Sequence, residues 1–210
     1  LRAMYWLAND TGVNGLCDLW HGDWNDGLSI ESPQKTRESI MVTEQFCHGL
    51  LEVAELAGRI GDEGVRDEAL SLHKQFARRL NEVAWDGEWY QRVLCHDGFI
   101  IGSKDSPEGQ IYMNAQSWAI LGGVAPPERA TVCMDSVEKH LKLDIGYRVC
   151  NPPFTRYDAR VGQNSTVYPG ETENGGCYNH AAGFKLVADC MLGRAEEAWA
   201  TFCKVAPGNP

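Results

Sequence analysis

Apolar residues recur at helical spacing along this chain, in stretches that short polar or glycine-containing breaks join into pairs. The first break, at 61–64, contains two glycines, and the later breaks contain glycine with or without proline. The pairs are 38–60 with 65–83, 112–121 with 128–141, and 180–192 with 195–205. This pattern predicts three helical hairpins in chain order.

Long irregular segments separate the predicted hairpins. Connections within helical bundles usually have about 2–8 residues, and longer ones commonly carry function. The lengths therefore favour half of a six-hairpin toroid, in which inner helices form a barrel and long loops gather at one mouth. A free-standing helical bundle is the alternative. We see no domain boundary within residues 1–210, and the aromatic turn at 85–90 predicts a short β-hairpin or an extended excursion.

Composition and charge narrow the class of protein. The chain has 210 residues, 43% of them hydrophobic, which is typical of a globular protein. Its net charge of -10 disfavours nucleic acids and anionic membranes as partners. We find no apolar run near the roughly 18 residues that span a bilayer. The eight cysteines include no CxxC pair, so we expect reduced thiols and a cytoplasmic protein, with a secreted disulfide protein as the alternative.

A dense cluster of polar and aromatic residues lies at 21–27, before the first hairpin. Asp23 and Asp26 flank Trp24 between two glycines. An indole face suits the C–H face of a pyranose, and a carboxyl packed against it is partly desolvated, which favours a proton donor. A structural turn with a packed tryptophan is the alternative.

A second cluster, at 168–180, leads into the third hairpin. Glycines surround Glu171, Glu173 and an amide, and His180 stands at the expected helix start. Backbone N–H groups at a helix start, next to an imidazole, suit an oxyanion or a phosphate. The alternative is a helix capped by Asn179 with a purely structural His180.

Together these clusters make the chain resemble glycoside hydrolase family 94, the inverting phosphorylases of cellobiose, chitobiose and related β-linked saccharides. The motifs are GDWNDG at 22–27, WDGEWY at 85–90, AQSWA at 115–119, PPF at 152–154 and ENGGCYNH at 173–180. The resemblance implies that residues 1–210 are part of an all-α (α/α)6 catalytic domain, roughly its second half. The family's N-terminal β-sandwich and C-terminal β-domain would lie outside this chain.

The resemblance also implies a role for individual residues. The family's general acid corresponds to Asp26, and its sugar-packing indole corresponds to Trp24. Glu173 matches a carboxylate that contacts sugar hydroxyls, Tyr168 matches a sugar-site tyrosine, and His180 matches a phosphate ligand. Where cellobiose-type members have lysine just before that glutamate, this chain has Thr172, so a cellobiose-type acceptor site is not implied.

The implied reaction is reversible phosphorolysis of a β-linked disaccharide or oligosaccharide to an α-sugar-1-phosphate and a shortened saccharide. Inorganic phosphate is a substrate, and no metal or other cofactor is expected. Family members are typically cytoplasmic homodimers, so we expect one here. One alternative is an inverting (α/α)6 glycoside hydrolase with Glu173 as the base. The other is a non-catalytic carbohydrate-binding helical module with Trp24 and Trp89 as platforms.

Overall fold

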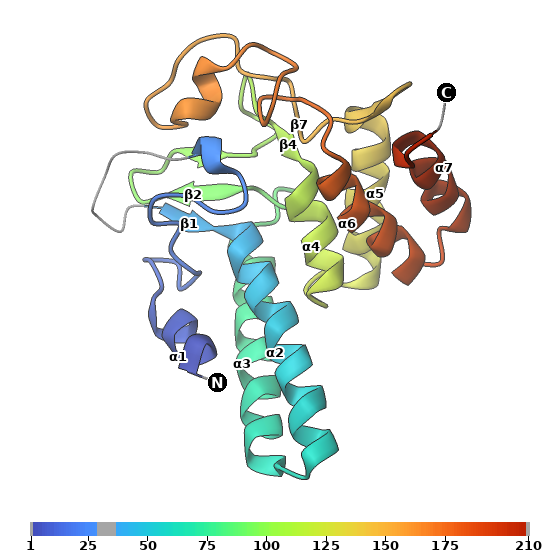
Figure 1. The fold of residues 1–210 in the computed structure, drawn as a ribbon. Helices are drawn as coiled ribbons and strands as arrows, with labels where there is room; N and C mark the ends of the chain where they lie inside the picture. Colours follow the sequence, from blue (N-terminus) through green and yellow to red (C-terminus); the bar gives the residue numbers. More distant parts are fainter. Residues whose placement is uncertain (1, 29–36, 209–210) are drawn as a thin grey trace.

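The computed structural model describes residues 2–28 and 37–208, and three helical hairpins dominate it (Figure 1). A short helix, α1 (Arg2–Asn9), precedes them. The hairpins are α2 (Ile40–Ile60) with α3 (Glu63–Val83), α4 (Met113–Leu121) with α5 (Pro127–Leu141), and α6 (Asn179–Met191) with α7 (Ala195–Val205). The prediction of three helical hairpins is confirmed.

Local chemistry sets the ends of the first hairpin. The Ser39 hydroxyl caps α2 by accepting the N–H of Val42 at 3.1 Å. Gly61 ends α2 with a φ of 76°, a left-handed conformation that glycine adopts without a Cβ clash. Asp62 then caps α3 by accepting the N–H of Val65. These residues explain why the helical pattern stops and restarts at this point of the sequence.

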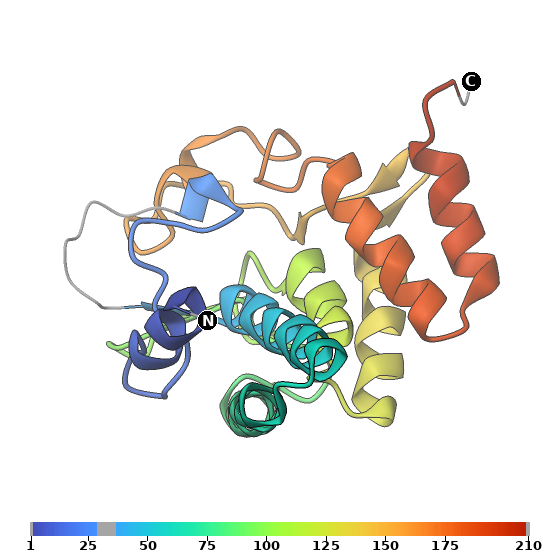
Figure 2. The same ribbon diagram turned by 60° about the horizontal axis from the view of Figure 1, so that its bottom comes forward.

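The first helix of each hairpin lies in an inner row. α4 packs against α2 on one side and α6 on the other, and α3, α5 and α7 each pack outside their own partner (Figure 2). Because α4 has neighbours on several sides, most of its residues are buried, including the polar Asn114, Gln116 and Ser117. The connections that lead into α2, α4 and α6 gather at the end of the row where these helices begin (Figure 1).

The hydrophobic core has three parts. The first lies between α2 and α3, where the rings of Phe46 and Phe76 meet edge to face with centroids 4.9 Å apart. The second joins α4, α5 and α6, and the third lies under the loops, around Leu28, Val93 and Val161. Within residues 2–28 and 37–208, no helix combines the length and the hydropathy needed to cross a membrane. No disulfide bond joins the eight cysteines, all of which lie in the described residues.

Short antiparallel strands lie among the loops of this mainly helical structure. β1 (Arg37–Ser39), β2 (Val93–Cys95) and β3 (Ile100–Ile101) form one sheet in that order. β4 (Ile111–Tyr112) pairs with β7 (Cys150–Asn151), and β5 (Lys142–Leu143) pairs with β6 (Gly146–Tyr147). Loop backbone buried at this end needs hydrogen-bond partners, and short strands supply them. At the predicted hairpin, Trp85 and Tyr90 form an isolated bridge.

A buried ion network ties the third hairpin to α5. Lys185 is fully buried, and its Nζ lies 2.6 Å from Asp189 Oδ2, 2.7 Å from Glu138 Oε1 and 2.9 Å from Thr201 Oγ1. Lys142 also pairs with Glu138, at 2.8 Å, but its side chain is 43% exposed. One carboxylate of α5 therefore serves a buried and an exposed cation.

The two lysines give a matched stability test. Replacing Lys185 with methionine leaves the buried Asp189 carboxylate without its ammonium partner, so we expect a loss of about 3–5 kcal/mol. Lys142→Met removes an exposed pair worth about 0.3–0.5 kcal/mol. Urea unfolding of the two variants would measure the difference. Equal losses would contradict the assignment of Lys185 as the central cation.

Candidate active site

The turn that carries the first cluster is fixed by a buried ion pair. Asp23 and Arg92 have side chains only 2% and 1% exposed, and Arg92 Nη2 lies 2.5 Å from Asp23 Oδ1. The Ser39 hydroxyl donates to Asp23 Oδ2 at 2.7 Å and accepts from Arg92 Nη1 at 3.1 Å. The N–H of Asn25 also donates to Asp23 Oδ1, at 2.9 Å. Asp23 therefore joins the turn to the start of α2 and to the residue before β2.

These contacts keep Asp23 ionised. Burial by itself would raise the pKa of this carboxyl, but the charge and hydrogen bonds of Arg92, with the Asn25 N–H and the Ser39 hydroxyl, bring the pKa below its ordinary value. Asp26, by contrast, is exposed. The desolvation expected for Asp26 against Trp24 is therefore not found in the described residues. Of the two carboxylates beside Trp24, the buried one, Asp23, is held by contacts that stabilise the turn.

Glu173 joins the two clusters, which lie far apart in sequence. Its Oε2 accepts the N–H of Gly27 at 2.6 Å, and its Oε1 accepts the N–H of Asp26 at 3.2 Å. The short 3-10 helix η1 (Asp26–Leu28) thus begins against the Glu173 carboxylate. A Cβ on Gly27 would lie 2.9 Å from Glu173 Oε2 and 3.0 Å from Asn164 Oδ1, so only glycine permits this approach without a shift. The glycine after Asp26 has a packing role.

The pKa of Glu173 is raised above its ordinary value. Burial is the main cause, the N–H groups of Gly27 and Asp26 oppose it, and the negative charges of Asp26 and Asp23 add to it. The Asp26 carboxylate is therefore near enough to act on Glu173 electrostatically. Two carboxyl groups from distant segments share one small region.

Asn174 holds the loop in which Glu173 stands. Its side chain is fully buried, accepts the N–H of Phe154 at 2.7 Å, and donates to the carbonyls of Phe154 and Val167, both at 2.8 Å. The following tight turn needs Gly176, because a Cβ there would lie 2.3 Å from the Thr172 carbonyl oxygen. The second 3-10 helix, η2 (Gln163–Thr166), packs against η1 (Figure 1). Hydrogen bonds and close backbone packing directly after Glu173 therefore fix the loop that carries it.

His180 lies in the first turn of α6 and contacts Trp24. The indole Nε1–H donates to His180 Nδ1 at 2.9 Å, across 156 sequence positions. Tyr178 meets the Trp24 ring edge-on, with centroids 5.6 Å apart. The imidazole also packs against Phe184, with centroids 4.6 Å apart. The structure thus brings together Trp24, Asp26, Glu173 and His180 of the predicted site residues.

Two other predicted residues do not join this group. The Tyr168 side chain is 78% exposed, and among the described residues we find no hydrogen bond that connects its hydroxyl to the cluster. Trp89, the second sugar platform of the binding-module alternative, is only 3% exposed and donates its indole N–H to the Gly102 carbonyl at 2.9 Å. A ring buried in this way has no free face for a sugar, so Trp89 offers no platform to the binding-module alternative.

Sequence reasoning missed the residues that support the site. Arg92 is a charged residue next to two apolar strand residues, which is a signal for a buried, paired cation. Ser39 directly precedes the first long helix, where an N-cap serine is expected. Asn174 had no comparable signal, because the backbone groups of Phe154 and Val167 that it bonds lie in a loop that the sequence does not define.

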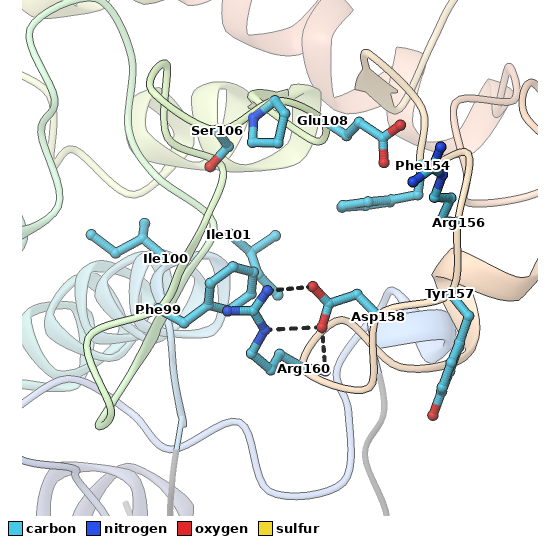
Figure 3. A pocket seen from close by; sticks show the side chains of 11 residues that line it. Phe99, Ile100, Ile101, Ser106, Glu108, Phe154, Arg156, Tyr157, Asp158 and Arg160 are labelled. Atoms are coloured by element: carbon cyan, nitrogen blue, oxygen red, sulfur yellow. Dashed lines mark hydrogen bonds and ion pairs between the residues drawn. The ribbon is translucent and has the colours of Figure 1, made fainter.

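A pocket of about 190 Å³ lies among the loops, and its lining residues differ from those of the cluster around Trp24 and His180 (Figure 3). β3 and the loop segments 106–108 and 154–160 supply its walls. Arg160 covers the Phe99 ring, with the guanidinium carbon 3.9 Å from the centroid, and pairs with Asp158 at 2.6 Å. None of the predicted site residues lines this pocket.

The fold is shared with solved carbohydrate-active enzymes. A family GH78 rhamnosidase of Bacillus sp. GL1 superposes with a TM-score of 0.63 at 18% identity, over 95% of this chain and 17% of that protein. At this identity the likeness establishes the fold alone.

The sequence assigns the family. The model of the glycosyl hydrolase 94 superfamily catalytic domain matches residues 1–210, and the chain belongs to this family. It is 38% identical over 210 residues to a solabiose phosphorylase of Paenibacillus borealis. It is 33% identical over 210 residues to a 3-O-beta-D-glucopyranosyl-beta-D-glucuronide phosphorylase of the same organism. Both matches cover 100% of this chain and 27% of the relative, so the chain spans about a quarter of these proteins.

Substitution of the buried aspartate should lower the free energy of unfolding far more than substitution of the exposed one. Asp23→Asn removes the partner of a buried arginine, and we expect a loss of about 3–5 kcal/mol at neutral pH. Asp26→Asn changes an exposed residue, and we expect a change within about 0.5 kcal/mol. Chemical denaturation as a function of pH would measure both.

The pH dependence follows from the lowered pKa of Asp23. Its stabilising effect is complete above the unfolded-state pKa of about 3.9 and disappears as pH falls towards the lower folded-state value. The stability gap between wild type and Asp23→Asn should therefore shrink below about pH 4. A gap that stays constant down to pH 2 would show that the Asp23 charge is not the stabilising element.

Proposed function

We propose that the protein to which this chain belongs is an inverting glycoside phosphorylase. It cleaves a β-linked disaccharide or oligosaccharide with inorganic phosphate and releases an α-sugar-1-phosphate and a shortened saccharide. The observation that carries the proposal is the joining of the turn at 23–27 to the loop at 171–180 through Glu173 and His180. Membership in a family whose named relatives are disaccharide phosphorylases supports it.

In this proposal each residue of the cluster has one task. Asp26 is exposed at the turn and protonates the glycosidic oxygen as the bond breaks. Trp24 packs against the sugar ring. Glu173 orients sugar hydroxyls and holds the Asp26 turn in place through its backbone N–H groups. His180 binds the phosphate that attacks C1 from the opposite face.

The contacts of Glu173, the second carboxylate, favour phosphate over water as the group that attacks the sugar. An inverting hydrolase needs a base that activates water, about 6.5–9.5 Å from the acid. Each oxygen of Glu173 already accepts a backbone N–H, which engages this carboxylate in holding the turn. Phosphate is an anion and needs donors rather than a base. The first turn of α6, with His180 in it, supplies donors at the site.

We also propose the larger architecture. The inner row of α2, α4 and α6, with α3, α5 and α7 outside, supports half of an (α/α)6 barrel whose mouth holds the cluster. The named relatives act on different sugars, a solabiose and a glucosyl glucuronide, so we propose only a β-linked saccharide as the substrate class. Residue 168 stays a proposed sugar-site residue through the family resemblance.

The proposal is tested on the full-length protein with a panel of β-linked disaccharides. We expect cleavage that requires phosphate, with an α-sugar-1-phosphate as the first product in proton NMR spectra. Cleavage in phosphate-free buffer with release of free sugar would identify a hydrolase instead. Saccharide binding without turnover on any substrate of the panel would favour a binding module.

Asp26→Asn should lose at least about 100-fold in kcat, since positioned acid catalysis contributes roughly 10²–10⁴-fold. Asp23→Asn should lose less, because the Asp23 carboxylate is engaged by Arg92, Ser39 and Asn25. Both rates are measured well below the unfolding temperature of the weaker variant. A greater loss for Asp23→Asn would reverse the assignment of the acid.

His180→Ala should raise the KM for phosphate much more than the KM for the disaccharide, because His180 is proposed to contact phosphate. Initial rates with each substrate varied in turn would separate the two constants. Equal increases in both would indicate that His180 only supports the loop and α6.

A further inference from the structure

The hydrogen bond between Trp24 and His180 determines which imidazole nitrogen carries the proton. An indole N–H can only donate, so His180 Nδ1, at 2.9 Å from Trp24 Nε1, must accept. In a neutral imidazole the other nitrogen then carries the hydrogen. His180 therefore offers Nε2–H as a donor, while its Nδ1 is occupied.

The surroundings of the imidazole keep this orientation. Phe184, one helical turn further along α6, packs on the ring with centroids 4.6 Å apart and a tilt of 52°. Trp118 of α4 packs on Phe184 at 4.9 Å. Tyr178 supports Trp24 from the edge. His180 itself is exposed, and no described residue forms a hydrogen bond with its Nε2, so this donor is free for a ligand.

We infer that Trp24 is a positioning residue for phosphate as well as a sugar platform, because its indole N–H fixes His180 in the form that donates from Nε2. This inference rests on the proposed phosphorylase function. Phosphate oxygens are acceptors, so an imidazole that presented a lone pair at Nε2 would repel them. The ring face of Trp24 and its Nε1–H therefore serve two different substrates, which links the sugar and phosphate sites through one side chain.

The effect of the Trp24 N–H can be measured separately from that of the ring. Trp24→Phe keeps an aromatic face but removes the donor, and it should raise the Kd for inorganic phosphate by roughly 3- to 10-fold, the range of one neutral hydrogen bond. The matched control is Trp118→Phe. Its Nε1 has no hydrogen-bond partner among the described residues, and its ring lies in the same aromatic row. Because phenylalanine keeps an aromatic ring at position 118, the packing on Phe184 is retained, and this control should leave the phosphate Kd unchanged.

A double-mutant cycle on the full-length protein tests whether Trp24 acts through His180. Phosphate binding is measured by calorimetry without sugar in wild type, Trp24→Phe, His180→Ala and the double variant. We expect Trp24→Phe to have no further effect on phosphate once His180 is alanine. Additive effects of the two changes would overturn the inference.

A conservative replacement adds an independent outcome. Glutamine has a carbonyl that can accept from Trp24 and an NH₂ that can donate to phosphate, so His180→Gln should bind phosphate more tightly than His180→Ala. That advantage should disappear when Trp24 is also phenylalanine. If it persists there, the indole N–H does not orient the side chain at 180.

These outcomes are distinct from those that test the proposed function. A wild-type protein that neither binds phosphate nor uses it in cleavage would remove the phosphorylase proposal itself. A wild-type protein that uses phosphate, but in which Trp24→Phe and Trp118→Phe bind it equally well, would remove only the role of the indole N–H.

Discussion

The buried pair of Asp23 and Arg92, closed by the Ser39 hydroxyl, is the interaction on which the candidate site depends. Burial of two charged groups is offset only when their geometry and hydrogen bonds are good. Here both carboxylate oxygens of Asp23 and the Ser39 hydroxyl form hydrogen bonds. The same hydroxyl caps α2. The turn that carries Trp24 and Asp26 is therefore held to the inner row of helices, and the exposed Asp26 lies on a turn that these contacts fix.

The two loop clusters then complete each other. Glu173 satisfies backbone N–H groups of the Asp26 turn, and the Trp24 indole satisfies His180 at the start of α6. Gly27 allows the carboxylate to approach, so the sequence pattern of glycine beside carboxylate reflects close packing of two segments. Carboxylates of one small region thereby differ in role. Asp23 is buried and paired with Arg92, Glu173 is half-buried and links the two segments, and Asp26 is exposed.

The hairpins could be predicted because helix periodicity and the glycine breaks are local signals, and both were present in each pair. The clusters around Asp26 and His180 could also be found, since their motifs carry the family resemblance. The contacts between the clusters could not, because they join positions as far apart as 24 and 180. The hydrogen bond of Trp89 could not either, since its acceptor is a carbonyl in a separate loop. The short strands were missed because a strand of only two or three residues is too short to show an alternating pattern of apolar and polar residues.

The most direct test of the account is a crystal structure of the full-length Asp26→Asn variant with a β-linked disaccharide and phosphate bound. The account predicts a sugar ring packed against Trp24, the glycosidic oxygen next to the side chain at position 26, and a phosphate oxygen within hydrogen-bond distance of His180 Nε2. The phosphate should lie on the face of the sugar opposite the leaving group. A phosphate bound away from His180, or a saccharide bound away from Trp24 and residue 26, would contradict it.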